Sequence, residues 1–473
     1  MLSFGSGWYG LPSVLALSVL AVACSKDEDH GKPPPSGDGG GSDAGGTACG
    51  LSATLVEQRS NCKFTAGALP EDTLGSCATA KNPIEHVIVL MQENRSFDQY
   101  YGHLKGHGQD DVDVPPESTS NPGSPADGGT GAVIPWHHEP QYCVTDTDHG
   151  WPASHRQYDD GKNDGFALSN SVASDPTGSR AMGYYDQTDI PFYYDLASTF
   201  AMSDRYFCSV LGPTYPNRMY LMGGTSFGIV TTDLNTLAPP GANQIFKALN
   251  DKNVDWKDYH ESIASGLLYP DFATDSAQAA HFVDISEFAK DAAAGTLPPF
   301  ALIDPNFSSA NIVQEDDEHP PSDIQMGQKF VYDQVQALMH SPEWKSSVLF
   351  ITYDEHGGLY DHVAPPAACA PDDTPPRLNP ELGNFDRLGF RVPLIVVSPY
   401  AKRHFVSHVV HSHTSILRFI EAKFGIGALT NRDANSDAMF DLLDFESPPN
   451  LDVPSFTEPA VSDAQAGTCA QNF

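Results

Sequence analysis

The chain has few basic residues. Lys and Arg together number 26 against 61 Asp and Glu, which gives 473 residues a formal net charge of −35. Such an excess of negative charge disfavours anionic partners, so nucleic acid and strongly anionic membranes are not expected ligands. A substrate with an anionic group therefore needs a local positive centre. A metal ion or protonated histidines would supply one, and the chain has 18 His.

Several binding motifs are absent as well. No two of the eight cysteines form a CxxC pair, which argues against a zinc ribbon. The chain contains neither a GxGxxG segment nor a P-loop, so no nucleotide cofactor is implied. The apolar run at residues 12–23 is short for a membrane-spanning helix and has the length of a signal-peptide core.

The amino-terminal segment predicts export. Residues 1–24 have the form of a signal peptide, and LAVAC resembles a bacterial lipoprotein cleavage site at Cys24, although Ala21 replaces the usual Leu and no Lys or Arg precedes the run. Residues 25–50 are rich in Gly, Pro and Asp and are expected to form a disordered tether. The predicted location is the cell envelope, periplasmic or extracellular. Membrane attachment through a lipidated Cys24 and a chain without lipid both stay open.

The number of cysteines bears on their pairing. If Cys24 carries a lipid, seven cysteines remain, and an odd number leaves one without a disulfide partner. Cys49, Cys62 and Cys77 are close enough in sequence to crosslink the amino-terminal lead-in. Their spacing does not fix the pairing.

Short apolar runs alternate with helical patterns. One helical pattern spans residues 323–341, with Asp323 as its expected cap. Strands alternating with helices predict an α/β fold: a doubly wound, mostly parallel sheet with helices on both faces, in one domain at residues 51–445. Residues 446–473 predict an irregular tail. The expected strands lie in four segments: residues 86–91, 298–307, 348–352 and 392–400.

Two of these apolar runs stop at oxygen-bearing side chains. Residues 86–91 lead into Glu93 and Asn94, and residues 348–352 lead into Asp354 and Glu355. Ligands of open α/β sheets bind at the carboxyl ends of the strands, so these four side chains could form an oxygen-rich cation site there. The alternative is that each pair caps a helix or lies in a solvated loop.

A hydroxyl group stands at the predicted start of a helix. Thr214, in GPTYPNRMYLMGG, precedes a helix expected to begin near Pro216. Free N–H groups and the helix dipole at that position suit a nucleophile that attacks and then carries a phosphoryl group. The alternative is an ordinary turn in which Thr214 only caps the helix.

Histidines cluster in polar loops. His149 and His155 lie in one loop, His319 in a second, and His356 and His362 in a third. Imidazolium groups near strand ends would bind phosphate oxygens and protonate a leaving group. A single histidine is more often structural.

Five motifs occur in the order ENRSFDQYYG, HGWPASHRQYDDGKNDGF, GPTYPNR, DDEHPPSD and TYDEHGGLYDHVAPP. As a set they resemble the bacterial phosphoesterase family that contains non-hemolytic-type phospholipases C and AcpA-type acid phosphatases. The resemblance covers about residues 83–425. It implies an alkaline-phosphatase-like α/β fold with one divalent metal ion, of unknown identity, at the carboxyl edge of the sheet and a Ser or Thr nucleophile.

The resemblance also implies the ligands of that ion. Glu93, Asn94, Asp354 and Glu355 match the family's metal ligands, and Thr214 matches the residue that is both ligand and nucleophile.

The family's phosphate-binding histidines match His149 and His319. His260, in the less distinctive DWKDYHESI, matches a third. His356 and His362 lie inside the metal motif and are assigned a supporting role.

We therefore expect a metal-dependent hydrolase of phosphate esters that works through a phosphothreonine intermediate, with a small molecule or a phospholipid as substrate. Phospholipases C of the family often carry additional carboxyl-terminal β-rich domains that this sequence does not show, so phosphomonoesters are the expected preference, as in acid phosphatases. One alternative is a phospholipase C acting on phosphatidylcholine-type phosphodiesters. The other is a catalytically silent surface lipoprotein that only binds.

Overall fold

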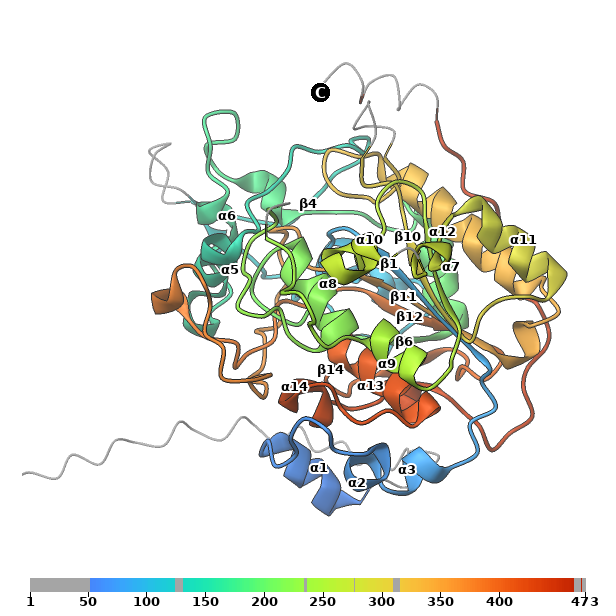
Figure 1. The fold of residues 1–473 in the computed structure, drawn as a ribbon. Coiled ribbons are helices and arrows are strands. Elements are labelled where there is room, and N and C mark those ends of the chain that lie inside the picture. The colour runs from blue at the N-terminus through green and yellow to red at the C-terminus, as the bar shows by residue number, and fades with distance from the viewer. Residues whose placement is uncertain are drawn as a thin grey trace, which may run out of the picture. The chain divides into compact units, whose positions relative to one another are not determined.

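The computed structural model describes residues 52–123, 131–233, 236–275, 277–308, 315–462 and residue 469 (Figure 1). The expected signal peptide and tether lie outside the described residues. Of the expected tail, residues 446–462 contain no helix or strand.

An eight-stranded sheet forms the centre of the fold, in the order β13-β6-β12-β11-β1-β10-β8-β9. β1 lies between β11 and β10 and is parallel to both. The pairings β10–β8, β8–β9 and β13–β6 are also parallel, whereas β12 is antiparallel to β11 and to β6. The predicted mostly parallel sheet is confirmed. The strands of this sheet are β1 (His86–Gln92), β6 (Ala201–Ser203), β8 (Trp256–His260), β9 (Phe282–Asp284), β10 (Phe300–Asp304), β11 (Ser347–Tyr353), β12 (Leu394–Val397) and β13 (Phe405–Ser407).

Three two-stranded sheets accompany the central one in the described part of the chain. Their strands are β2 (Asn121–Pro122), β3 (Ala132–Val133), β4 (Trp136–His137), β5 (Gly183–Tyr184), β7 (Tyr206–Phe207) and β14 (His411–Ser412).

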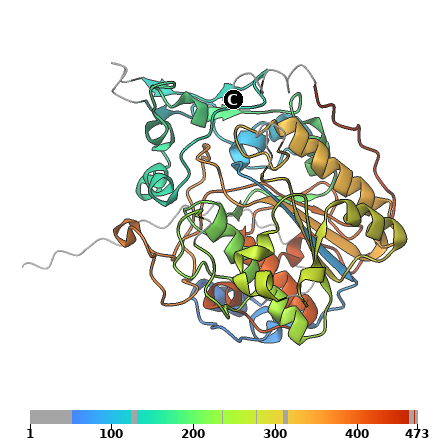
Figure 2. The ribbon, with the colours of Figure 1, turned by 45° about the horizontal axis from the view of Figure 1, so that its top comes forward.

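Helices lie on both faces of the central sheet (Figure 2). α12 packs with α11 and α7, and α13 packs with α8, α9 and α14. Because both faces are covered, β1 and β11 are continuous apolar runs rather than alternating ones. Among the described helices, none has the length and apolar character needed to cross a membrane. The helices are α1 (Ala53–Ser60), α2 (Pro70–Leu74), α3 (Ser76–Thr79), α4 (Phe97–Tyr101), α5 (Trp151–Tyr158), α6 (Phe166–Ser169), α7 (Pro191–Thr199), α8 (Thr214–Gly223), α9 (Ile245–Asp251), α10 (Pro270–Thr274), α11 (Ser286–Ala294), α12 (Ile324–Met339), α13 (His413–Phe424) and α14 (Asn431–Ala434).

Two helix starts can be compared with the sequence. α12 begins after Asp323, whose side chain accepts a hydrogen bond from the Gln325 N–H, as the expected cap requires. α8 begins at Thr214, close to the expected start near Pro216, so that Thr214 is the first residue of the helix. Pro216 occupies the first turn, where its missing N–H leaves no helical hydrogen bond unmade.

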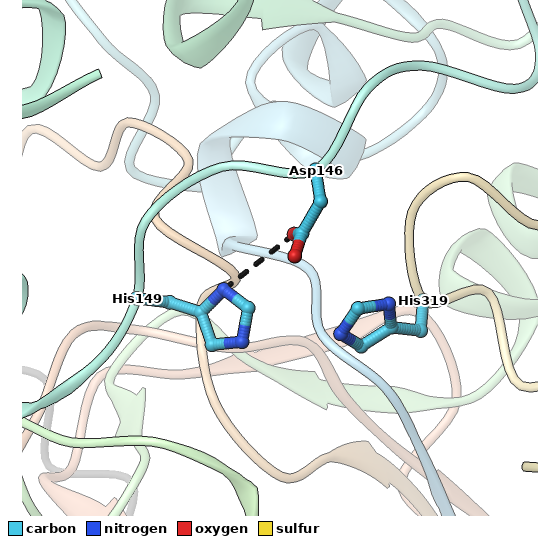
Figure 3. A group of neighbouring side chains, drawn as sticks. All are labelled: Asp146, His149 and His319. Carbon is cyan, nitrogen blue, oxygen red and sulfur yellow. Dashed lines mark ion pairs between the residues drawn. The ribbon is translucent and has the colours of Figure 1, made fainter.

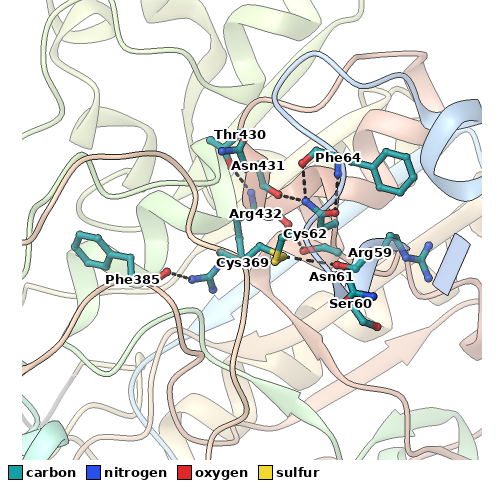
Figure 4. The surroundings of a disulfide bond; sticks show 12 residues. Arg59, Ser60, Asn61, Cys62, Phe64, Cys369, Phe385, Thr430, Asn431 and Arg432 are labelled. Carbon is teal, nitrogen blue, oxygen red and sulfur yellow. Dashed lines mark hydrogen bonds between the residues drawn. A yellow bond between two sulfur atoms is a disulfide. The ribbon is translucent and has the colours of Figure 1, made fainter. Parts of the chain in front are cut away.

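Disulfide bonds tie distant segments together. Cys62, just after α1, pairs with Cys369, which is 307 residues away (Figure 4). Arg432 of α14 lies beside this bond and donates to the carbonyl of Cys369. Cys143 pairs with Cys469. Cys77 is also disulfide-bonded, and Cys208 is a free, buried thiol.

Candidate active site

Two neighbouring strands of the sheet end in acidic and amide side chains. β1 and β11 are parallel, with Gln92 opposite Tyr353, so the residues that follow both strands lie at one edge. The Asp354 N–H donates to the carbonyl of Gln92 over 3.1 Å, and the Asn94 amide donates to the Glu355 carboxylate. The structure thus brings together the four strand-end residues predicted as metal ligands. We call them the acidic edge: Glu93, Asn94, Asp354 and Glu355.

Two oxygen atoms of the acidic edge are buried without a hydrogen bond. Asn94 and Asp354 are fully buried, and within the described part of the chain neither Asn94 Oδ1 nor Asp354 Oδ2 has a hydrogen-bond partner, although Asp354 Oδ2 is ion-paired with Arg218 over 3.5 Å. An unsatisfied buried acceptor costs about 1–3 kcal/mol. Burial, together with the nearby Glu93, raises the pKa of Asp354 well above its usual range. A hard divalent cation would satisfy both oxygens, so this donor set fits such an ion.

A glycine lets the two strand ends approach. Gly357 has a φ of +64°, and a Cβ atom at this position would overlap the carbonyl oxygen of Asn94. The DEHGG sequence therefore needs glycine for close packing as well as for its backbone conformation.

Arg218 of α8 is a site residue that the sequence reasoning missed. Its guanidinium is 3.3 Å from the Glu93 carboxylate, 3.5 Å from that of Asp354 and 3.0 Å from that of Asp304. Burial opposes the charge, but these three carboxylates raise the pKa of Arg218 above its ordinary value. Its spacing of one helical turn after Thr214 is the signal that was available in GPTYPNR.

Thr214 is the first residue of α8 and lines a cavity of about 730 Å³. Glu93, His149, Arg218 and His319 line the same cavity. Thr214 therefore borders the same space as Glu93 of the acidic edge and two of the predicted histidines. A helix start at this position favours negative charge on a bound group.

His149 is held against the acidic edge. Its Nδ1 lies 2.6 Å from the carbonyl of Thr147, and its Nε2 lies 3.2 Å from Asn94 Nδ2 and 3.7 Å from the Glu355 carboxylate. Burial disfavours the imidazolium, but Glu355 and Asp146 raise the pKa of His149 to about 9. Burial likewise opposes ionisation of Glu355, but His149 and His356 lower its pKa to about 2.

His319 faces His149 across the cavity, with ring centroids 5.5 Å apart (Figure 3). Asp146 lies 3.6 Å from His149 Nδ1, and the ligand atoms of Asp146, His149 and His319 lie within 4.8 Å of one another. These three residues form a second group that could hold a metal ion or, through its histidines, an anion. Sequence reasoning did not single out Asp146, although it stands three residues before His149 in TDTDHG.

The other predicted histidines lie elsewhere. His260 ends β8, which β10 separates from β1, and it is not among the residues that line the cavity. His356 is buried, with Nε2 2.8 Å from Gln157 Oε1 and Nδ1 3.2 Å from Glu355, so it supports an acidic-edge residue.

His362 belongs to a separate buried network. Its Nδ1 is 2.8 Å from Asp98, and its Nε2 is 3.4 Å from Asp113. Arg391 pairs with Asp98 over 2.7 Å and with Asp361 over 2.9 Å. This network connects loops beside the site and does not reach the cavity lining.

The cavity has walls of two kinds. Part of the lining carries the charged groups described above. The remaining wall is largely apolar and is lined by Trp151, Val230, Leu237, Ile263, Ala264, Leu267, Leu268 and Phe307. Such a lining can contact both a polar and an apolar part of one ligand.

Comparison with known proteins identifies the class: the protein is a hydrolase that acts on phosphate esters. A model of the Phosphoesterase family matches residues 84–427, and the chain belongs to this family. It is 32% identical over 450 residues to phospholipase C B of Mycobacterium tuberculosis, covering 84% of this chain and 85% of that protein. It is 30% identical over 410 residues to non-specific phospholipase C6 of Arabidopsis thaliana, covering 82% of this chain and 77% of that protein.

Solved structures resemble the chain more weakly. A protein of the alkaline phosphatase superfamily from Vibrio parahaemolyticus is 9% identical with a TM-score of 0.36, over 91% of this chain and 98% of its own. The lipoteichoic acid synthase LtaP from Listeria monocytogenes is 10% identical with a TM-score of 0.37, over 82% and 81%. At these scores the likeness supports no statement about the site.

Proposed function

We propose that the protein is a metal-dependent phospholipase C, which hydrolyses the phosphodiester bond between the lipid alcohol and the phosphate. The observation that carries this proposal is the mixed lining of the cavity, in which Thr214, His149 and His319 share one space with several apolar side chains. A phosphate group would bind at the charged groups, and the acyl-bearing alcohol would lie against the apolar side chains.

The acidic edge and Thr214 would hold the metal ion. A bound divalent cation supplies a positive charge that lowers the pKa of the nucleophile and stabilises charge on the phosphoryl oxygens. The unsatisfied oxygens of Asn94 and Asp354 support this assignment. His149 and His319 line the cavity together, with ring centroids 5.5 Å apart, and imidazolium groups there would bring positive charge to a bound phosphate. We therefore assign His149 to phosphate oxygens.

The reaction proposed has two displacements at phosphorus. The Thr214 hydroxyl releases its proton to solvent and its oxygen attacks in line, so that a bond from oxygen to phosphorus forms while the bond from phosphorus to the lipid alcohol breaks. His319 donates a proton to the departing alkoxide, and His149 binds the remaining phosphoryl oxygens. Water then cleaves the ester on Thr214 and releases the phosphorylated headgroup. With a phosphomonoester, the same steps pass through phosphothreonine.

The relatives weaken the reason for expecting phosphomonoesters. That expectation rested on extra carboxyl-terminal domains that the sequence does not show and on the strong negative charge. The first reason loses weight, because this chain aligns with 85% of the length of a protein named phospholipase C. The size of the cavity and its apolar wall then favour a lipid phosphodiester.

The test compares kcat/KM for dihexanoyl phosphatidylcholine, p-nitrophenyl phosphorylcholine and p-nitrophenyl phosphate between pH 5 and pH 8. We expect both phosphodiesters to be hydrolysed with higher kcat/KM than the monoester. A large preference for p-nitrophenyl phosphate would make the protein an acid phosphatase instead. No hydrolysis of any of them, with divalent cations present, would favour the silent binding protein.

A further inference from the structure

We propose that Glu318 is a positioning residue, whose buried carboxylate holds His319 in place relative to the acidic edge. This inference rests on the proposed function, since it assigns a role within the same site. Glu318 does not line the cavity, so it acts through its neighbours and touches no substrate.

The carboxylate of Glu318 accepts hydrogen bonds from tyrosines on three separate elements. Tyr100 of α4 donates over 2.6 Å, Tyr353 at the end of β11 donates over 2.8 Å, and Tyr193 of α7 donates to the other carboxylate oxygen. Glu318 and the three tyrosines are at most 2% exposed. A buried carboxylate with three hydroxyl donors occupies one well-defined position, because any shift breaks bonds that water cannot replace.

The backbone of Glu318 is fixed as tightly as its side chain. Arg95 donates from Nε to the carbonyl oxygen of Glu318 over 2.9 Å, and its Nη2 donates to the same oxygen. Glu318 has a φ of +71°, a conformation that residues other than glycine adopt at a cost. The strained conformation persists because these contacts over-determine it, and it sets the direction in which His319 leaves the chain.

Hydrogen bonds also join this loop to the strand that carries the first half of the acidic edge. The side chain of Gln92 donates to the carbonyl of Asp316 over 2.9 Å, and the backbone N–H of Glu93 donates to the carbonyl of Asp317 over 2.8 Å. The loop before His319 is thus paired with the end of β1.

The partners of Glu318 are themselves neighbours of site residues. Arg95 directly follows Asn94, and Tyr353 directly precedes Asp354. Glu318 directly precedes His319, so one carboxylate connects both halves of the acidic edge to a histidine of the cavity. On α12, a Cβ atom at Gly327 would overlap the Glu318 side chain, so glycine leaves the space that this carboxylate occupies.

The test uses Glu318→Gln, which keeps the size of the side chain and removes its charge. Partners that orient ligating side chains typically contribute about 10–100-fold, so we expect kcat for p-nitrophenyl phosphorylcholine to fall by about that factor. Affinity for inorganic phosphate, measured calorimetrically with divalent cation present, should fall about 10-fold, because His319, which would contact the phosphate oxygen in the leaving-group position, is displaced. Both are measured well below the Tm of each variant.

The matched control is Glu421→Gln. Glu421 is equally buried and is held by Arg418 on α13, and it is not among the described residues that line the cavity. It should lower Tm and leave kcat and phosphate affinity unchanged. Tyr193→Phe removes one hydroxyl donor to Glu318 and should lower kcat several-fold. It becomes the only test variant if Glu318→Gln does not fold. In the double variant the Tyr193→Phe loss should not add to that of Glu318→Gln, because the two groups act as one unit.

Unchanged kcat and phosphate affinity in Glu318→Gln would overturn the inference. So would equal losses in Glu421→Gln, because they would reduce the role of Glu318 to general stability. If the wild type hydrolysed no phosphoester, the proposed function would fail, while the phosphate affinities of the variants would still decide the role of Glu318.

Discussion

Replacing Arg218 by Met tests how charge is balanced at the acidic edge. The guanidinium lies within 3.5 Å of carboxylates of Glu93, Asp354 and Asp304, and it is nearly fully buried. Met keeps most of the side-chain volume and removes the charge. The variant therefore leaves buried carboxylates without their cation.

The expected cost depends on whether a divalent cation is bound. Removing one partner of a buried ion pair costs about 3–5 kcal/mol, so Arg218→Met should lose about that much of the free energy of unfolding in a metal chelator. A cation at the acidic edge would replace part of the lost positive charge near Glu93 and Asp354. The loss should then shrink to about half, since Asp304 alone still lacks its partner.

The assay is chemical unfolding of wild type and Arg218→Met, in chelator and in saturating divalent cation. Arg218→Lys is the control: it keeps the charge but not the branched donor geometry, so its loss should be smaller than that of Met. Equal losses for Arg218→Met with and without cation would refute the reasoning, because they would place the ion away from these carboxylates.

Three further predictions concern the nucleophile, the pH dependence and a disulfide. Thr214→Ala should lower kcat by at least about 10³-fold with an unchanged Tm, whereas Thr214→Ser should retain partial activity, and near-parental turnover by Ala in a steady-state assay would eliminate covalent catalysis. Burial opposes protonation of His362, but Asp113 and other carboxylates raise the pKa of His362 to about 9. The contribution of protonated His362 to the free energy of unfolding is therefore complete below the pKa of an unfolded histidine and is lost as pH rises through about 9. Between pH 6 and pH 9.5 the free energy of unfolding of the wild type should fall by at most about 3 kcal/mol, and this fall should be missing in His362→Asn. Parallel pH profiles of the two proteins would contradict the prediction. Replacing Cys62 and Cys369 together by Ser should cost about 2–5 kcal/mol in chemical unfolding, and unchanged stability would show that the bond adds nothing.

Much of the fold could be predicted because its signals are local. The apolar runs of β1 and β11 are continuous, since helices cover both faces of the sheet, and each run ends where its polar residues begin. The direction of β12 could not be predicted, because a short buried strand has the same apolar residue pattern whether it pairs in parallel or antiparallel. Nor could the partner of Cys62, since the bond spans 307 residues.

The site was predictable in part for the same reason. The strand-end residues and Thr214 stand in recognisable motifs, and β1 and β11 are direct neighbours in the sheet. Arg218 and Glu318 were missed because their roles depend on contacts between segments far apart in sequence: Arg218 with Asp304, and Glu318 with Tyr100. His260 was predicted from a weak motif, and its strand lies beyond β10 from the acidic edge.

Trapping the covalent intermediate tests the central claim most directly. Wild-type protein with divalent cation is mixed with p-nitrophenyl phosphorylcholine, quenched in acid during turnover, digested and analysed by mass spectrometry. We expect a phosphorylcholine ester on the Thr214 side chain, and none in Thr214→Ala. The contradicting result is a burst of one equivalent of nitrophenol together with an adduct on a histidine, or on any other residue than Thr214.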